Sequence, residues 1–232
     1  MEQYQIENPV YRVVSVLVNE YIPHMGWAIV DSTMKPISPA DYTADKIISD
    51  IERNEHVRID AVRKKARGAR KRVIILVVDK DRALSTKVDG FRALIRSAES
   101  SAGDSLSDLI VVADSTTFDK KNIVSIITTR QKEFSTPGAD SAGTIPFYNM
   151  YPYFVFVSNL TKHVDYDQHE IVESQGLHIL GHKISDLPMI LTTDPAIIWC
   201  GARENQIVKV TRFSPTTLSA IIYRRVIKGS IA

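Results

Sequence analysis

Two pairs of histidines in this sequence have a spacing that could bind a metal ion. His178 and His182 are four residues apart, so on a helix both imidazoles would lie on one face. His163 and His169 form a second, wider pair. A zinc site needs a third protein ligand, and no third ligand or helical zinc-protease motif is evident. We therefore favour solvent-facing or core histidines, and we expect no metal and no cofactor.

A second group of residues has the composition of a nuclease site. Asp119-Lys120-Lys121 has an Asp-x-Lys spacing, and Asp79 and Asp81 follow an apolar segment. Hydrolysis with two metal ions needs carboxylates that converge on the ions. Asp119 follows a Ser-Thr-Thr segment, where aspartate commonly caps a helix, and no convergent set is evident. We expect no catalytic residues and keep a nuclease-like protein as an alternative.

A dense basic run occupies residues 63–72. Its cations are Arg63, Lys64, Lys65, Arg67, Arg70, Lys71 and Arg72. Like charges at this density repel one another, which favours a solvated, mobile loop before a strand. The run also suits a nuclear-import signal or sequence-independent contact with phosphates. A stand-alone nucleic-acid-binding module is a further alternative, although the sequence has no helix-turn-helix, zinc-finger or aromatic RNA-binding motif.

Composition narrows the class of protein. The chain has 232 residues and a formal net charge of +2, so any basic function must come from a local patch. Cys200 is the only cysteine, which excludes an internal disulfide and a cysteine-cluster metal site, and favours a reducing compartment. No apolar run approaches the roughly 20 residues needed to span a bilayer, and the N-terminus lacks the layout of a signal peptide.

Hydrophobic periodicity organises the first half of the chain. Apolar residues recur at helical spacing over residues 11–21, an extended segment follows at 26–30, and a second helix begins after residues 38–41. The apolar runs 73–78 and 109–113 predict strands buried on both faces.

A helix is predicted between these two buried strands, over residues 89–97. The order strand, helix, strand implies a right-handed crossover and a parallel pair of strands. Residues 120–128 would form the next helix, with a strand as the alternative because isoleucine and valine dominate.

Residues 136–152 contain a flexible stretch without periodicity, and we place a linker there. Beyond it, strands are predicted at 153–157 and 169–172, with a helix of a few turns over 177–184.

A short helix is specified at both ends in the last third of the chain. Asp194 can cap its N-terminus, Pro195 suits the first helical position, and Gly201 can adopt the left-handed conformation that closes it. Two strands follow at 206–213 and 220–227, separated by turn residues at 214–217.

The residues around this helix and its strands resemble a known family. The matching residues are Leu187, Pro188, Ile190, Asp194, Pro195, Gly201, Gln206, Ile207, Val208, Lys209, Val210, Arg212, Ser214, Tyr223 and Arg224. In order and spacing they resemble the C-terminal domain of the fifth-largest subunit shared by the eukaryotic nuclear RNA polymerases, a family that also includes the corresponding archaeal subunit. Asn159-Leu160-Thr161-Lys162-His163 resembles that family's Asn-aliphatic-Thr-x-His segment.

The first half is similar to the N-terminal jaw domain of the same subunit. The corresponding features are Tyr11-Arg12 at the start of the first helix, Gly26-Trp27, and the strand-helix-strand unit over residues 73–113. The family's jaw resembles the restriction-endonuclease fold. The resemblance therefore implies that fold, without its activity, for this half of the chain.

The resemblance implies a fold class of α+β or α/β with two domains. These are a jaw over residues 1–135, the linker 136–152, and a small mixed-sheet assembly domain over 153–232. It also implies a non-catalytic subunit of a multisubunit DNA-dependent RNA polymerase, located in the nucleus, or in the nucleolus if dedicated to polymerase I. Its partners would be the largest subunit, other polymerase subunits and, weakly and without sequence preference, downstream DNA.

The resemblance also implies which residues act in assembly with the largest subunit. These residues are Asp194, Pro195, Gly201, Gln206, Lys209, Arg212, Tyr223 and Arg224. The basic run over residues 63–72 is the candidate for contact with nucleic acid, beside the import signal and the solvated loop.

The chain departs from the family pattern at three places. Arg203-Glu204-Asn205 replaces a basic pair followed by glycine, and Leu218-Ser219-Ala220 replaces a Gly-Arg-Tyr run. The chain also continues past Val226. Asn205 can take the left-handed conformation in place of a glycine. Such changes suggest a lineage-specific paralogue or a subunit of a divergent or viral polymerase.

Overall fold

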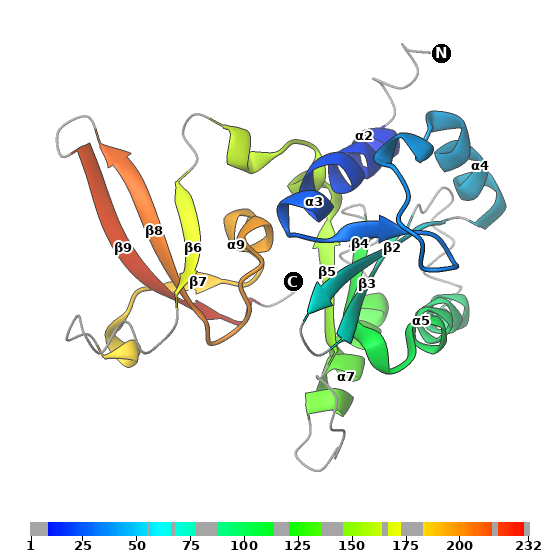
Figure 1. The fold of residues 1–232 in the computed structure, drawn as a ribbon. Coiled ribbons are helices and arrows are strands. Elements are labelled where there is room, and N and C mark those ends of the chain that lie inside the picture. The colour runs from blue at the N-terminus through cyan, green and yellow to red at the C-terminus, as the bar shows by residue number, and fades with distance from the viewer. Residues whose placement is uncertain are drawn as a thin grey trace. The chain divides into compact units, whose positions relative to one another are not determined.

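The computed structural model describes residues 9–54, 56–65, 68–77, 88–113, 121–135, 146–163, 167–172, 183–214 and 218–229. The chain divides into two compact units, Met1–Ser158 and Asn159–Ala232. Each unit combines helices with a sheet that has both parallel and antiparallel pairs, so the fold is mixed α+β (Figure 1).

The first unit is built on a sheet with the strand order β1-β2-β3-β4-β5. Its strands are β1 (Ala28–Val30), β2 (His56–Lys65), β3 (Gly68–Val77), β4 (Leu106–Ala113) and β5 (Phe147–Pro152). β1, β2 and β3 pair antiparallel, and β3, β4 and β5 pair parallel. The predicted extended segment at 26–30 is thus confirmed as strand β1.

The central strands β3 and β4 are buried on both faces, as their continuous apolar runs predict. Helix α5 (Val88–Ala102) connects them, and the two strands pair in parallel from Val73 with Leu109 to Val77 with Ala113. The predicted strand-helix-strand unit and its parallel pair are therefore confirmed.

Helices α5 and α7 (Lys121–Ser135) cover one face of this sheet (Figure 1). The Tyr148 amide donates to Gln131 Oε1 of α7 at 2.7 Å, and Lys71 reaches the Ser101 carbonyl of α5. Lys71 and Tyr148 lie on the same face because their strands pair in one register. The helix predicted over 120–128 is confirmed from Lys121 onward, and the strand alternative is wrong.

The opposite face is covered by the first helical segment, as predicted for residues 11–21. It consists of α2 (Pro9–Val16), a π-helical turn (Leu17–Tyr21) and α3 (Ile22–His24). Pro23 has no amide to donate to Asn19, and the preceding turn is wider than an α-helical one.

The predicted second helix begins with a capping box. Ser38 caps the 3₁₀ turn Pro39–Asp41, and helix α4 (Ala44–Asn54) follows. The Ser38 amide donates to Asp41 Oδ2 at 3.0 Å, and the Ala40 amide donates to Ser38 Oγ at 3.3 Å.

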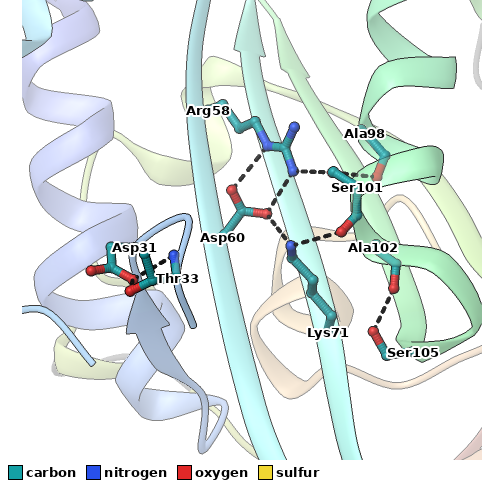
Figure 2. Close-up of polar contacts among 9 residues, drawn as sticks. All are labelled: Asp31, Thr33, Arg58, Asp60, Lys71, Ala98, Ser101, Ala102 and Ser105. Atoms are coloured by element: carbon teal, nitrogen blue, oxygen red, sulfur yellow. Dashed lines mark hydrogen bonds and ion pairs between the residues drawn. The ribbon is translucent and has the colours of Figure 1, made fainter. Parts of the chain in front are cut away.

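A partly buried group of charges joins β2, β3 and α5 (Figure 2). Asp60 Oδ2 accepts from Arg58 Nε at 2.9 Å, and Asp60 Oδ1 forms an ion pair with Lys71 Nζ at 3.3 Å. Arg58 also donates to Ser101 Oγ, and Lys71 donates to the Ser101 carbonyl at 3.5 Å. Both cations thus lie beside the last turn of α5, where the partial negative charge of a helix favours them.

The prediction of a solvated loop for the basic run is wrong. Residues 63–65 and 68–72 belong to β2 and β3, and Lys71 and Arg72 are each only 6% exposed. Lys71 pairs with Asp60, and Arg72 Nη2 lies 3.5 Å from Asp108 Oδ2 on β4. Reasoning from like charges failed because each of these two cations has a carboxylate on a neighbouring strand, on opposite faces of the sheet.

The boundary between the units also differs from the predicted linker at 136–152. Residues 147–152 form β5, which pairs with β4, and the division falls after Ser158. The predicted strand at 153–157 is instead a 3₁₀ turn, Tyr153–Phe156, whose buried Val155 and Phe156 pack within the first unit. Phe156 contacts Tyr21 edge-to-face with ring centres 4.9 Å apart.

The second unit contains a sheet with the strand order β6-β8-β9-β7. Its elements are β6 (Gln168–Val172), β7 (Met189–Leu191), α9 (Pro195–Cys200), β8 (Ile207–Ser214) and β9 (Leu218–Ile227). β6, β8 and β9 pair antiparallel, and β7 pairs with β9 in parallel. The strands predicted at 169–172, 206–213 and 220–227 are confirmed.

Two further predictions for this unit fall mainly outside the described residues. The helix predicted over 177–184 reaches them only at its end, where Ile184–Asp186 is a 3₁₀ turn. The turn predicted at 214–217 lies outside them beyond Ser214. No helix in the described part of the chain is both long and apolar enough to cross a bilayer.

Replacing Asp60 tests the charged group at the centre of the first unit. In Asp60→Asn the side chain of Lys71, 8% exposed, keeps its charge without a carboxylate. We expect a loss of about 2–3 kcal/mol in the free energy of unfolding, measured by urea denaturation and circular dichroism. Asp89→Asn is the control, because Asp89 is 97% exposed beside Arg92 and should leave stability unchanged. Equal losses in the two variants would contradict a structural role for Asp60.

Candidate functional site

Helix α9 begins and ends at the residues that the sequence predicts as its caps. Asp194 Oδ1 accepts from the Ala196 amide at 2.8 Å, and Pro195 occupies the first turn. Gly201 is left-handed, with φ 72° and ψ 19°, and its amide donates to the Ile197 carbonyl at 2.9 Å. The predicted capping roles of Asp194, Pro195 and Gly201 are confirmed.

The apolar side of α9 covers one face of the second sheet. Ile197 is fully buried against side chains of β7, β8 and β9. These side chains are Ile190, Val208, Val210 and Val226. Asp194, Pro195 and Gly201 therefore hold a helix that completes the core of its own unit, and they act through the position of that helix.

The other face of the second sheet carries several exposed apolar side chains among the described residues. Cross-strand partners share a face, so Ile207, Lys209, Thr211 and Phe213 of β8 lie beside Arg225, Tyr223, Ile221 and Ser219 of β9. Met189 and Leu191 of β7 pair with Arg225 and Ile227 and belong to the same face. We call these residues of β7, β8 and β9 the open face.

Four apolar side chains of the open face are strongly exposed. Phe213 is 77% exposed, Met189 58%, Ile221 54% and Leu191 46%. Ile207 and Tyr223 are packed there, against Leu187 and Ile184. None of the four was among the predicted site residues. The sequence did contain one signal for this surface. Ile221 and Ile222 are adjacent and therefore point to opposite faces of β9. Only one short helix precedes β9 in this part of the sequence, and it can cover one of the two faces, so the other would stay exposed.

Arg225 is a second feature of the open face that the sequence did not single out. Its side chain lies between Ile207 of β8 and Met189 of β7 in the strand register. The Nε atom of Arg225 is buried and has no hydrogen-bond partner in the described residues. A buried donor without an acceptor is costly, and a carboxylate or carbonyl supplied from outside would satisfy it.

Lys209 and Arg212, two of the predicted assembly residues, tie β8 to the β6 end of the sheet. Lys209 Nζ lies 3.5 Å from Glu170 Oε2, and Arg212 Nε lies 2.6 Å from Asp167 Oδ2. Lys209 belongs to the open face, whereas Arg212 points to the α9 side. Exposed pairs of this kind contribute at most about 1 kcal/mol to stability, so both cations can exchange partners at little cost.

Gln206, Tyr223 and Arg224 have three different environments. Gln206 Oε1 accepts from the Arg203 amide at 2.6 Å and closes the turn before β8. Tyr223 packs on the open face, and Arg224 lies on the α9 side, opposite Val208. The eight predicted assembly residues therefore do not form one surface.

Asn205 precedes β8 with φ 67°, so it takes the left-handed conformation expected where the resembling family has glycine. Leu218 also has a positive φ, 63°, at the start of β9. Leucine resists this conformation more strongly than asparagine does. The replacement of the family's Gly-Arg-Tyr run thus leaves backbone strain at this hairpin.

The predicted nucleic-acid contacts lie on the β2–β3 hairpin. Arg63 and Arg70 are directly opposite each other in the ladder, as are Lys65 and Gly68. Arg63 and Arg72 also lie over the ring of Trp27, with their guanidinium carbons 4.8 and 4.5 Å from its centre.

Burial separates the basic residues into two groups. Lys71 and Arg72 are inside the unit, whereas Arg63 and Arg70 are not fully buried. The backbones of Lys64 and Lys65 complete β2, and Arg67 lies outside the described residues.

The residues weighed for metal binding and hydrolysis are largely beyond the described part of the chain. His178, His182, Asp79, Asp81, Asp119 and Lys120 all lie outside it. His169 is described, and its Nδ1 lies 2.6 Å from the Asp167 carbonyl. Within the described ranges, no group of three or more histidine, cysteine, aspartate or glutamate residues could hold a metal ion.

Cys200, at the end of α9, packs against the core of the second unit. Burial raises the pKa of the Cys200 thiol to about 11. The thiol is therefore protonated at neutral pH, and it serves as a small apolar packing group rather than as a nucleophile.

Comparison with known proteins gives one matching family. The sequence model described as RNA polymerase Rpb5, C-terminal domain, matches residues 158–226. This range corresponds to most of the second unit, which begins at Asn159.

The individual relatives include viral and archaeal proteins. The DNA-directed RNA polymerase RPB5 homolog of African swine fever virus is 28% identical over 128 residues, which are 53% of this chain and 58% of the viral protein. The DNA-directed RNA polymerase subunit Rpo5 of Methanocaldococcus jannaschii is 40% identical over 76 residues, 31% of this chain and 97% of the archaeal protein. Rpo5 of Methanococcus vannielii is 33% identical over 76 residues, 31% of this chain and 97% of that protein. The match thus spans little more than half the length of the viral relatives.

Gly201→Val tests the left-handed end of α9. A β-branched residue resists a φ of 72°, so we expect a loss of about 1–3 kcal/mol in the stability of the second unit. Urea unfolding would be followed by the fluorescence of the buried Trp199 in a Trp27→Phe background, which leaves one tryptophan. Gly201→Asn is the matched control, because asparagine tolerates this conformation and should cost less. Equal effects of valine and asparagine would contradict the role assigned to Gly201.

Proposed function

Because the chain belongs to the Rpb5 family of RNA polymerase subunits, we propose that it is a non-catalytic subunit of a multisubunit DNA-dependent RNA polymerase. The second unit docks on the largest subunit, and the first unit is the jaw that lines the downstream DNA channel. The chain makes and breaks no bonds itself. It shapes the entry path of the DNA and stabilises the assembly around it.

The open face carries the docking half of this proposal. Large contiguous apolar surfaces on a protein mark sites where another molecule binds. Burying apolar area contributes roughly 25 cal/mol per Å², so the exposed side chains of Phe213, Ile221 and Met189 give a partner a substantial gain. The Nε of Arg225, which has no partner in the described residues, adds a requirement for an acceptor. The surface of the largest subunit that fits is therefore apolar, with a carboxylate or carbonyl opposite Arg225.

The β2–β3 hairpin supports the contact with DNA. Arg63 and Arg70 face each other in the ladder, and like charges directly opposite destabilise a strand pair. A phosphate group beside them would offset this repulsion. The contact is sequence-independent because phosphates are the same at every base pair. The jaw would be restriction-endonuclease-like in fold and inactive.

Charge placed on the open face tests docking. We expect Phe213→Glu combined with Ile221→Glu to lower incorporation into the polymerase at least tenfold, because two carboxylates would have to be buried. The free chain should unfold at the same urea concentration as the parent, since both side chains are exposed. The measurement is the amount of chain that co-purifies with the tagged largest subunit.

Ile171→Glu provides the control for docking. Ile171 is 42% exposed, but it pairs with Val208 and lies on the α9 side of the sheet. Its substitution should leave incorporation unchanged. Full incorporation of the doubly substituted open face would refute docking through this surface.

The DNA contact is tested by the salt dependence of binding. In polymerase assembled with Arg70→Ala, the slope of log affinity for downstream duplex against log salt should fall by about one unit, because one phosphate contact is lost. Arg53→Ala, on the exposed surface of α4, is the control and should keep the parental slope. An unchanged slope in the Arg70 variant would exclude it from the DNA path.

A further inference from the structure

A groove lies between helices α5 and α7 of the first unit. It encloses about 230 Å³. Its lining residues are Arg92, Ile95 and Arg96 of α5 and Ser125, Ile126, Thr129, Arg130 and Glu133 of α7. Both helices connect parallel strands of one sheet, so they run in the same direction. The groove therefore has distinct ends, set by the residues that face each other across it.

The bottom of the groove is apolar. Ile95 is 1% exposed and Ile126 is 9% exposed, although both line the groove. Ser125 and Thr129 are exposed on the wall formed by α7. Thr129 lies one turn after Ser125. Its hydroxyl can donate a hydrogen bond to a bound peptide backbone or accept one from it. The groove thus combines an aliphatic floor with hydroxyl groups on one side.

The charges at one end of the groove are already satisfied. Arg130 Nη1 lies 2.7 Å from Glu133 Oε2, and Arg130 Nη2 lies 2.9 Å from Glu99 Oε2. Tyr148 donates its hydroxyl to Glu99 Oε1 at 2.8 Å. Arg130 is thus paired with two glutamates, which leaves this end of the groove little attraction for a further carboxylate.

The cations at the other end are paired less completely in the described residues. Arg92 and Arg96 are one helical turn apart on α5, so their side chains project from the same side of the helix. Arg92 lies 3.3 Å from Asp89, which is 97% exposed and contributes little. Arg96, which is exposed, makes no hydrogen bond or ion pair with the residues that the structure describes. Two arginines at this spacing form a site for a carboxylate.

We propose that this groove binds an acidic peptide segment of another protein. An aliphatic side chain of that segment lies over Ile95 and Ile126, and a neighbouring carboxylate is held by Arg92 and Arg96. The aliphatic floor favours a peptide over a nucleic acid, whose backbone offers charge without an aliphatic anchor. The groove is lined by residues of α5 and α7 and by none of the open face or of the β2–β3 hairpin, so it adds a partner to those of the proposed function.

The probe for this site is a short fluorescein-labelled peptide that contains leucines among glutamates. Its affinity for the full chain would be measured by fluorescence anisotropy. We expect binding that weakens at least tenfold when the leucines become alanine, and again when the glutamates become glutamine. Arg92→Glu with Arg96→Glu should also weaken it at least tenfold, and Thr129→Trp should block the groove directly.

The matched control carries the same change in charge away from the groove, as Arg53→Glu with Lys183→Glu, both on exposed positions. It should bind the peptide as the parent does. A labelled DNA duplex is titrated in parallel. The proposal is overturned if the peptide does not bind, if the control weakens binding as much as the groove variant, or if the duplex binds more tightly and depends on Arg92 and Arg96. Incorporation into the polymerase is a separate measurement, so failure here does not decide the proposed function.

Discussion

A sheet that is apolar on both faces needs cover on both, and the two sheets of this chain meet that constraint differently. In the first unit, α5 and α7 cover one face and the α2–α3 segment covers the other (Figure 1). In the second unit α9 covers one face, and the open face keeps Phe213, Met189 and Ile221 in contact with solvent. Helices of the same unit thus cover both faces of the first sheet, whereas the second sheet has exposed apolar side chains that suit a partner.

The charges inside the first unit show how the same sheet accommodates polar groups. Lys71 and Arg72 are adjacent on β3 and point to opposite faces, where Asp60 and Asp108 lie within 3.3 and 3.5 Å. Their pairing joins β2, β3, β4 and the end of α5. Removing one partner from such a buried pair leaves a charge without compensation, so the loss of one residue costs more than the pair itself contributes to stability.

Local signals in the sequence predicted the elements that depend on neighbouring residues. The caps of α9, the left-handed Asn205 and the buried strands β3 and β4 could all be assigned from residue type and periodicity. Pairing between distant segments could not be read in this way. The basic run looked like a solvated loop because Asp60 and Asp108 lie elsewhere in the sequence, and β5 looked like a linker because its partner β4 is remote. The open face was missed for the same reason, since it appears only when three strands share one register.

The second unit is small, and this explains why apolar side chains remain exposed on its open face. An exposed apolar face of this kind is where a partner is expected to bind. A short chain buries a smaller fraction of its surface than a long one. Among the described residues, a helix of 6 residues covers one side of a four-stranded sheet. A partner that covers the open face binds the folded unit and not the unfolded chain, so it stabilises the unit by mass action. Folding of the second unit would then be linked to the proposed docking. Such a partner could also supply an acceptor to Arg225 Nε, which has none among the described residues.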